Sequence, residues 1–142
     1  MKIHIITVGE PKLPYAQAGF EMYIKRLSHY HTVRITHIAD KNNTAAYFTQ
    51  AAGASFIVAM VIQGTQISSE HLAKFIEQRN QDGREVAFLI GGPDGLPSGI
   101  IAASHLQLSF SKLTFPHDLA MVVLAEQLYR ASTIASGQPY HR

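Results

Sequence analysis

The sequence predicts an α/β domain with a mainly parallel β-sheet flanked by helices. First, apolar, β-branched segments alternate along the chain with segments of helical periodicity, which is the order expected of βαβ units. Second, Phe56–Ile62 (FIVAMVI) is apolar without interruption, as expected of a strand buried on both faces of a parallel sheet. Third, the chain has no internal repeat or linker, so residues 1–142 are expected to form a single domain.

The N-terminal half contains two predicted strands and two predicted helices. Lys2–Val8 alternates and is rich in β-branched residues, so it predicts a strand that ends at Gly9. Apolar residues at helical spacing predict a helix over Pro14–Ser28. Arg34–Ile38 is predicted to be the second strand, and Asn43–Gly53 a short helix that ends at its glycine.

The alternation continues in the C-terminal half. Gln63-Gly64-Thr65 is expected to end the strand Phe56–Ile62, and Ser68 or Ser69 to cap a helix that runs to about Asn80. The remaining predicted elements are a strand at Glu85–Ile90, a short helix at Pro97–Ala103, a strand at His105–Phe110 and a long apolar helix between Pro116 and Gly137.

Composition excludes several classes of protein. The chain has no cysteine, which rules out disulfides, thiolate zinc sites and cysteine nucleophiles. Its eight histidines lack metal-ligand spacing, so no metal site is expected. No segment approaches the roughly 18 apolar residues of a membrane span, and no signal-peptide pattern is present, so a cytoplasmic protein is expected. The formal charge of +2 permits a nucleic-acid partner without requiring one.

Three predicted strand ends are candidates for a ligand site, because ligands of parallel α/β sheets bind beyond the carboxyl ends of the strands. They are Met60–Gly64, Ile90–Gly95 and Leu108–Thr114. These segments carry few charged side chains and are rich in glycine and serine. They therefore predict a small-molecule site built largely from backbone groups.

The loop Gly91-Gly92-Pro93-Asp94-Gly95 has the spacing of neither a Walker loop nor a Rossmann fingerprint. In one interpretation it is a tight turn, in which glycines adopt positive φ and the proline fixes one turn residue. In the other, Gly91 lets the backbone approach a ligand closely. The sequence leaves both interpretations open.

Ser109 and Ser111, together with His117 and Asp118, raise the alternative of a serine hydrolase. A nucleophile elbow requires Gly-x-Ser-x-Gly, which the chain lacks. The simpler interpretation is that the serines form turns and that Asp118 interacts favourably with the dipole of the long helix.

Polar residues interrupt the C-terminal helix and follow it. Glu126 and Arg130 are four residues apart and are expected to pair on the surface, although Arg130 is equally a candidate for a phosphate contact. After Gly137, the tail Gln138–Arg142 combines an aromatic ring, an imidazole and a guanidinium. Stacking, proton transfer and phosphate pairing are what an RNA base and its backbone require, so an ordered tail is expected to be functional.

Four segments in register resemble the RlmH family of SPOUT-class RNA methyltransferases. They are Leu89–Leu96 (LIGGPDGL), Leu108–His117 (LSFSKLTFPH), Leu124–Ala131 (LAEQLYRA) and Pro139–Arg142 (PYHR). The resemblance implies an S-adenosylmethionine-dependent enzyme that has a C-terminal trefoil knot and works as a homodimer. It also implies methylation of N3 of a pseudouridine in 23S rRNA, within the ribosome or large subunit and without a metal.

By matched position, the resemblance implies which residues hold the methyl donor. Backbone groups are expected to bind the adenine edge, while apolar side chains enclose its faces. The expected cofactor-binding residues are Met60, Gly91, Leu108, Ser109, Phe110, Ser111, Lys112 and Leu113.

The resemblance also implies roles for the tail. His141 is expected to help N3 of the target base lose its proton. Arg142 is expected to stabilise the resulting anion or to bind phosphate, and Tyr140 is expected to stack.

Contacts with RNA are expected from Lys25, Arg26 and Arg130. Met121 stands where many members of the family have arginine, which is expected to remove a potential RNA contact. The alternative to the enzyme is a small α/β module that binds a nucleotide or RNA without chemistry. Affinity for S-adenosylmethionine, with weak binding of ATP or NAD, distinguishes the two.

Overall fold

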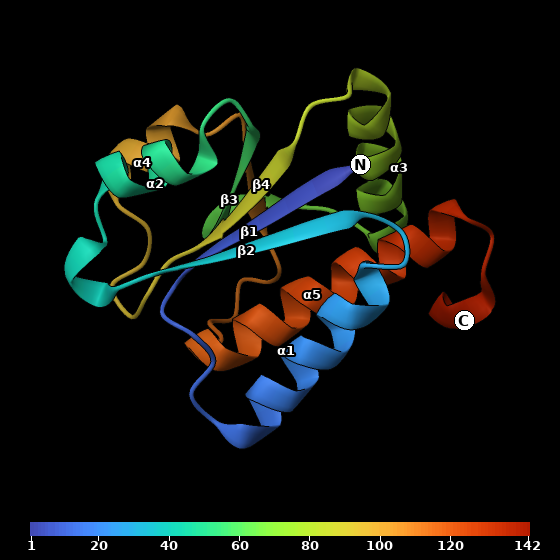
Figure 1. The fold of residues 1–142 in the computed structure, drawn as a ribbon, viewed down its shortest axis with the longest axis horizontal. Coiled ribbons are helices and arrows are strands. Elements are labelled where there is room, and N and C mark those ends of the chain that lie inside the picture. Colours follow the sequence, from blue (N-terminus) through green and yellow to red (C-terminus); the bar gives the residue numbers. More distant parts are fainter.

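A five-stranded sheet, with all strands parallel, forms the centre of the computed structural model, which describes residues 1–142 (Figure 1). The strands lie in the order β2-β1-β4-β3-β5. Their bounds are β1 Lys2–Val8, β2 Thr32–Ile38, β3 Phe56–Gln66, β4 Val86–Ile90 and β5 Leu106–Ser109. The predicted α/β class and parallel sheet are confirmed.

Helices cover both faces of the sheet (Figure 1). One face carries α1 (Pro14–Leu27), α3 (Ser69–Asp82) and α5 (His117–Ala135), and the other carries α2 (Ala45–Ala52) and α4 (Ser98–Ala103). Two short 3₁₀ turns, η1 (Asp40–Asn42) and η2 (Pro139–His141), follow β2 and α5. No helix combines the length and the apolar character that crossing a bilayer demands.

Local capping explains where the helices begin and end. The hydroxyl of Thr44 accepts the N–H of Tyr47 at the start of α2, and the hydroxyl of Ser68 accepts the N–H of His71 at the start of α3. Gly83 ends α3 at φ 71°, in the left-handed region that favours glycine. The predicted helices are therefore confirmed, with bounds close to those expected.

The prediction that β3 ends at Gln63-Gly64-Thr65 is wrong. The strand continues to Gln66 because it pairs again with β5 beyond that point, Thr65 opposite Leu108 and Gln66 opposite Ser109. A partner strand from elsewhere in the chain thus overrides the local turn signal.

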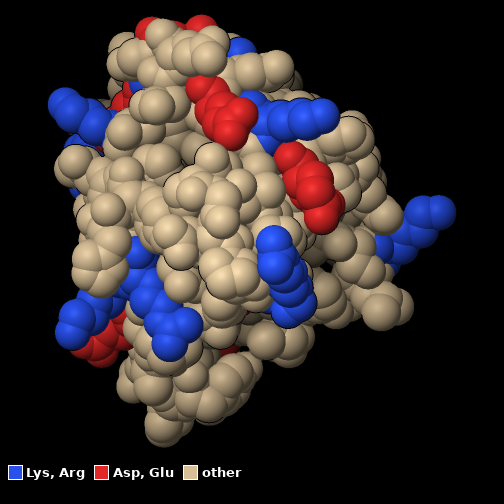
Figure 2. All heavy atoms as spheres, turned by 90° about the vertical axis from the view of Figure 1, so that its right-hand side faces the viewer, with Lys and Arg blue, Asp and Glu red and all other residues tan.

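Charged side chains of both signs are scattered over the side of the molecule that carries the C-terminus (Figure 2). Basic and acidic residues lie near one another in small groups, and broad uncharged areas separate the groups. A mixed surface of this kind fits the small net charge of +2. On this side of the molecule, binding of nucleic acid would therefore depend on local groups rather than on one large basic area.

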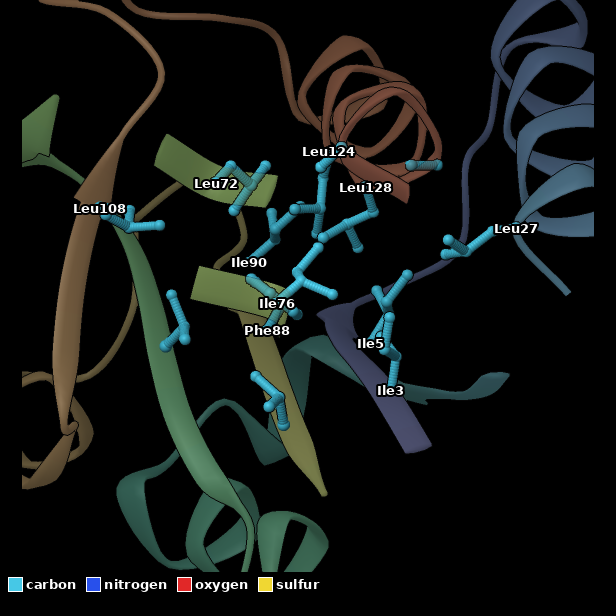
Figure 3. Packing of buried hydrophobic residues seen from close by; sticks show 14 of the residues in the cluster. Ile3, Ile5, Leu27, Leu72, Ile76, Phe88, Ile90, Leu108, Leu124 and Leu128 are labelled. Carbon is cyan, nitrogen blue, oxygen red and sulfur yellow. The ribbon is translucent and has the colours of Figure 1, made fainter. Parts of the chain in front are cut away.

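Two hydrophobic clusters hold the layers together, one on each face of the sheet. In the larger cluster, Leu124 and Leu128 of α5 point toward Ile5 and Phe88 on the sheet (Figure 3). Met121 is fully buried in this cluster. At this position the chain therefore presents no side chain to RNA, which agrees with the expectation that methionine here removes a potential RNA contact.

We expect the stability of the fold to decrease as the pH falls from about 6.5 to 4, in part because of His31. Burial, and then the nearby N-terminal amino group, lower the pKa of His31 to about 4, and its Nε2 lies 3.0 Å from the Ser132 hydroxyl. The unfolded chain binds a proton at His31 below about pH 6.5 and the folded chain does not, so acid favours unfolding in that window.

Urea unfolding at pH 7.5 and at pH 4.5 measures this effect. After allowance for solvent screening, His31 is expected to account for about 1–2 kcal/mol of the difference. The variant His31→Gln should show a smaller difference between the two pH values. An unchanged difference would contradict the assignment to His31.

Candidate functional site

The register of three neighbouring strands brings the predicted cofactor segments to one edge of the sheet. Met60 on β3 pairs with Leu108 on β5 and lies level with Ile90 on β4. Gly91 directly follows Ile90 and Ser109 directly follows Leu108, so both residues lie at the carboxyl ends of their strands. Adjacent strands are about 4.8 Å apart, so Gly91 and Ser109 lie about 10 Å apart across the sheet, with Met60 of β3 between them.

A bulge in β3 lies beside this edge. Met60 and Thr65 both lie opposite Leu108, so the four residues between them, 61–64, leave the ladder with β5. A Cβ on Gly64 would lie 2.7 Å from the carbonyl carbon of Leu108, which is backbone that cannot easily move. Glycine at this position therefore lets β3 return against β5, a requirement that the sequence alone did not reveal.

The loop 91–96 folds tightly on itself. The N–H of Gly95 donates to the carbonyl of Gly92 at 2.9 Å, and Gly95 has φ 79°, so the tight-turn interpretation is confirmed. A Cβ on Gly91 would overlap the carbonyl carbon of Gly95 and lie 2.5 Å from the nitrogen of Leu96. The close approach that requires glycine at position 91 is thus made by the loop's own backbone.

The loop 110–115 leaves most of its backbone unpaired. The Ser109 hydroxyl donates to the Ser111 carbonyl at 2.8 Å, and the Ser111 hydroxyl accepts the N–H of Leu113 at 3.0 Å. The backbone of residues 110–115 makes no other hydrogen bond within the protein. Its remaining amide and carbonyl groups are available to the edge of a heterocyclic ligand.

The same contacts weigh against the hydrolase alternative. Both serine hydroxyls are occupied by turn hydrogen bonds, and neither is bonded to a histidine. Their predicted role in turn formation is confirmed. A nucleophilic serine would instead require a base within hydrogen-bond reach.

Asp118 has a role that the sequence did not predict. It lies in the first turn of α5, as expected, but its side chain is only 7% exposed. Its Oδ2 accepts the N–H of Lys12 at 2.9 Å and the N–H of Leu13 at 2.7 Å. The carboxylate therefore ties the segment before α1 to the start of α5, directly after the loop 110–115.

The C-terminal tail forms η2 and packs on α5. The Tyr140 hydroxyl donates to Oε2 of Glu126 at 2.9 Å, and its ring meets Tyr129 edge-on with centroids 4.6 Å apart. Burial, and then the neighbouring Tyr23 and Glu126, raise the pKa of Tyr140, which keeps the hydroxyl a donor. The ring expected to stack on a base is packed against the protein's own α5.

The predicted RNA-binding residues differ in exposure and in their contacts within the protein. Arg130 pairs with Glu126 at 2.7 Å and lies 5.1 Å from the centroid of the Tyr140 ring. The expected Glu126–Arg130 pair is confirmed, but it is partly buried and holds the tail. Lys25 and Arg26 are exposed in the last turn of α1, and Arg26 lies 5.7 Å from the Tyr129 ring.

Comparison with known proteins identifies the family. Residues 1–141 match the family model described as a predicted SPOUT methyltransferase. The chain is 46% identical to ribosomal RNA large subunit methyltransferase H of Deinococcus radiodurans, over 100% of this chain and 99% of the relative. It is 40% identical to the protein of the same name from Desulfotalea psychrophila, over the full length of both. The chain belongs to the RlmH family of SPOUT methyltransferases.

Solved structures agree with this family at the level of the fold. A probable methyltransferase from Bordetella pertussis Tohama I aligns with a TM-score of 0.60 at 14% identity, over 92% of this chain and 93% of that one. A probable methylase family protein from Haemophilus influenzae Rd KW20 aligns with a TM-score of 0.59 at 11% identity, over 96% and 67%. At such low identity these matches support the α/β architecture alone.

Membership of the RlmH family makes S-adenosylmethionine the expected ligand of the edge formed by β4, β3 and β5. The groups present fit it: unpaired backbone in the loop 110–115 can hydrogen-bond an adenine ring, and the half-buried Met60 and the exposed Leu113 provide apolar surface. The predicted contact of the Leu108 side chain is not supported, because Leu108 is only 4% exposed and packs in the core. The structure brings together the cofactor residues predicted from the sequence. It does not bring His141 or Arg142 of the same chain to them, since these follow the far end of α5 (Figure 1).

We expect Glu126 to hold the C-terminal tail, residues 138–142, in place. In Glu126→Ala the Tyr140 hydroxyl and the Arg130 guanidinium both lose their acceptor, so amide hydrogen exchange in residues 138–142 should become at least about threefold faster, corresponding to about 0.7 kcal/mol or more of local opening free energy. Exchange in the middle of α5 should not change. The control Glu77→Ala removes an exposed glutamate of α3; equal effects of the two variants would contradict a specific role of Glu126.

Proposed function

We infer that this protein is an S-adenosylmethionine-dependent methyltransferase that acts on large-subunit ribosomal RNA. The observation that carries the inference is similarity over the whole chain to relatives named for that activity, at up to 46% identity among those compared. The convergence of Met60, Gly91 and the loop after β5 at one edge of the sheet supports it. The protein would act as a single-domain enzyme of the cytoplasm and without a metal.

In the proposed site, S-adenosylmethionine supplies a methyl group carried on a sulfonium. The backbone of Ser109–Leu113 would bind the adenine edge, and Met60 and Leu113 would cover its faces. The loop 91–96, whose shape depends on Gly91, would form the opposite wall. Because a sulfonium leaves without protonation, these residues serve mainly to position donor and acceptor.

The finer proposal concerns the acceptor, N3 of a pseudouridine in 23S rRNA on the ribosome or large subunit. An imide nitrogen becomes nucleophilic when it loses its proton. His141 would take that proton or stabilise the anion, Arg142 would bind the anion or a phosphate, and Tyr140 would stack on a base or fix the tail. His141→Ala should retain binding of S-adenosylmethionine but lose most turnover; full turnover would refute this role.

We further propose a homodimer, in which the tail of one protomer completes the cofactor site of the other. Within one chain, Tyr140 is bonded to Glu126, nine residues beyond the start of α5, or about 14 Å along the helix from the loop 110–115. A tail held at this distance from the cofactor loop of its own chain would reach the cofactor site of a partner chain more readily. The family's trefoil knot, with the C-terminal part threaded through a loop, is part of the same proposal.

Mixing two inactive variants tests the shared site. A Gly91 variant lacks a working pocket and a His141 variant lacks a working tail, so a mixed dimer contains one intact combination. Partial recovery of activity after the variants are mixed, unfolded and refolded together is expected. No recovery, with mixed dimers demonstrated by mass spectrometry, would contradict a site shared between protomers.

The function itself is tested with isotopically labelled S-adenosylmethionine and large subunits that lack the modification. Label should appear in 23S rRNA, and mass mapping of nuclease fragments should identify the nucleotide. Binding of RNA and S-adenosylmethionine without transfer would favour the non-catalytic binding module. Label in tRNA or protein would overturn the substrate assignment.

A further inference from the structure

A hollow beside the edge strand β2 lies outside the proposed methyl-transfer site. Its volume is about 390 Å³, within the range of about 300–1,000 Å³ typical of small-molecule sites. One wall is formed by the carboxyl end of β2, and the others by η1 and α2. The polar residues that line it include His37, Asn42, Tyr47 and Gln50.

The backbone of His37 offers the hollow a donor and an acceptor. β2 is the outermost strand and pairs only with β1. The Thr32 N–H donates to Met1 at 3.0 Å, and the Ile38 carbonyl accepts from Gly9 at 2.7 Å. The backbone N–H and C=O groups of the even-numbered residues of β2 therefore point toward β1. Those of the odd-numbered residues, His37 among them, point away from β1, toward the open edge of the sheet.

Side chains around this edge are of the kinds that recognise a nucleobase. Tyr47 lies on α2 with 47% of its surface exposed, and its ring can stack on a base. The side-chain amides of Asn42 and Gln50 each carry a donor and an acceptor, and neither is engaged in a hydrogen bond within the protein. An aromatic face, free amides and an open strand edge together meet the needs of a single-stranded RNA base.

The hollow is linked to the proposed cofactor site. Asn43, the residue that follows η1, donates from Nδ2 to the carbonyl of Gly95 at 3.4 Å, so the segment directly after η1 contacts the loop 91–96. Both sites lie at the carboxyl edge of the sheet. Three strand spacings, about 14 Å, separate β2 from β3, which leaves the hollow within reach of a nucleotide near the methylated one.

We propose that this hollow binds an unpaired nucleobase of the rRNA close to the target nucleotide, stacked on Tyr47 and hydrogen-bonded by the His37 backbone and the Asn42 and Gln50 amides. The proposal rests on the proposed function, because it takes RNA as the substrate. A peptide adding to the open edge of β2 would be the competing occupant. A hollow of this volume beside an exposed aromatic ring fits a planar base better than an extended strand.

Steady-state methylation of unmodified large subunits by two Tyr47 variants tests the proposal. Tyr47→Leu removes the aromatic plane and keeps a strong helix former in α2, whereas Tyr47→Phe keeps the plane. Stacking of one base is worth about 1–3 kcal/mol, so Tyr47→Leu should lower kcat/KM by about 5- to 150-fold, mainly through KM. Tyr47→Phe should stay within about twofold, and calorimetry should show unchanged affinity for S-adenosylmethionine in both.

Ultraviolet crosslinking to large subunits provides a readout that does not depend on methyl transfer. A nucleotide attached to the peptide that contains residues 45–52, and lost in Tyr47→Leu, would support the hollow even if the wild-type protein transferred no methyl group. In that case the proposed function alone would fail. Normal KM in Tyr47→Leu, or a crosslink from this peptide to a ribosomal protein instead of rRNA, would overturn the proposal.

Discussion

Replacing Gly91 by alanine is expected to weaken binding of S-adenosylmethionine at least tenfold, or about 1.4 kcal/mol. The added Cβ would overlap the Gly95 carbonyl carbon and lie 2.5 Å from the Leu96 nitrogen. All of these neighbours are backbone atoms, so the loop 91–96 must move as a whole, which typically costs about 1–3 kcal/mol. Calorimetric titration of the cofactor and thermal unfolding measure the two consequences separately.

Gly19→Ala is the matched control. Its Cβ would meet only the side chain of Val122, at 3.3 Å, and alanine favours a helix over glycine by about 1 kcal/mol. Cofactor affinity should therefore remain unchanged in the control. If Gly91→Ala lowers Tm but leaves the affinity intact, the loop does not form part of the cofactor site. If Tm is also unchanged, the loop 91–96 is not packed as tightly around Gly91 as the structure describes.

Replacing Asp118 by alanine is expected to be the most destabilising single polar substitution among those considered for this chain. It removes the acceptor of two backbone N–H groups, those of Lys12 and Leu13. Each unsatisfied donor costs about 1–3 kcal/mol. Because Lys12 and Leu13 are exposed, so that water can partly replace the lost acceptor, we expect a total of about 2–4 kcal/mol. For a chain of this length the loss corresponds to a fall in Tm of about 6–12 °C.

Two further variants separate hydrogen bonding from charge. Asp118→Asn keeps one side-chain oxygen as an acceptor and should lose less than half as much stability. Asp82→Ala removes an exposed carboxylate that pairs with Arg79 on the surface of α3, and it should cost less than about 1 kcal/mol. Equal losses in Asp118→Ala and Asp82→Ala would contradict a structural role for the buried carboxylate.

Asp118 illustrates why part of the site escaped prediction. Its position after Pro116 correctly indicates the first turn of a helix, because capping and dipole preferences are local. Its hydrogen-bond partners lie 105 and 106 residues away in the chain. Periodicity and capping rules carry no information about which remote backbone meets a given side chain.

The cofactor loops show the opposite case. The carboxyl ends of β4 and β5 were predicted from apolar runs followed by glycine or serine, and the loops lie where the strand ends were expected. The end of β3 was missed, because pairing of Thr65 and Gln66 with β5 extends the strand beyond a local turn signal. The resemblance of four segments to the RlmH family indicated the cofactor and substrate before the fold was known.

The sequence by itself determined the alternation of strands and helices, the burial of Ile57–Ala59 at the centre of β3 and the family to which the chain belongs. These follow from backbone preferences, periodic burial and short motifs, all of which act over a few residues. The sequence did not foresee that Ile62, at the end of the same apolar run as Ile57–Ala59, is 45% exposed. The tertiary structure alone decided the strand order, the close contact of Gly64 with β5, the bonds of Asp118 and the hollow beside β2. Each of these depends on how segments distant in the chain are registered against one another, which the pattern within any one segment does not specify.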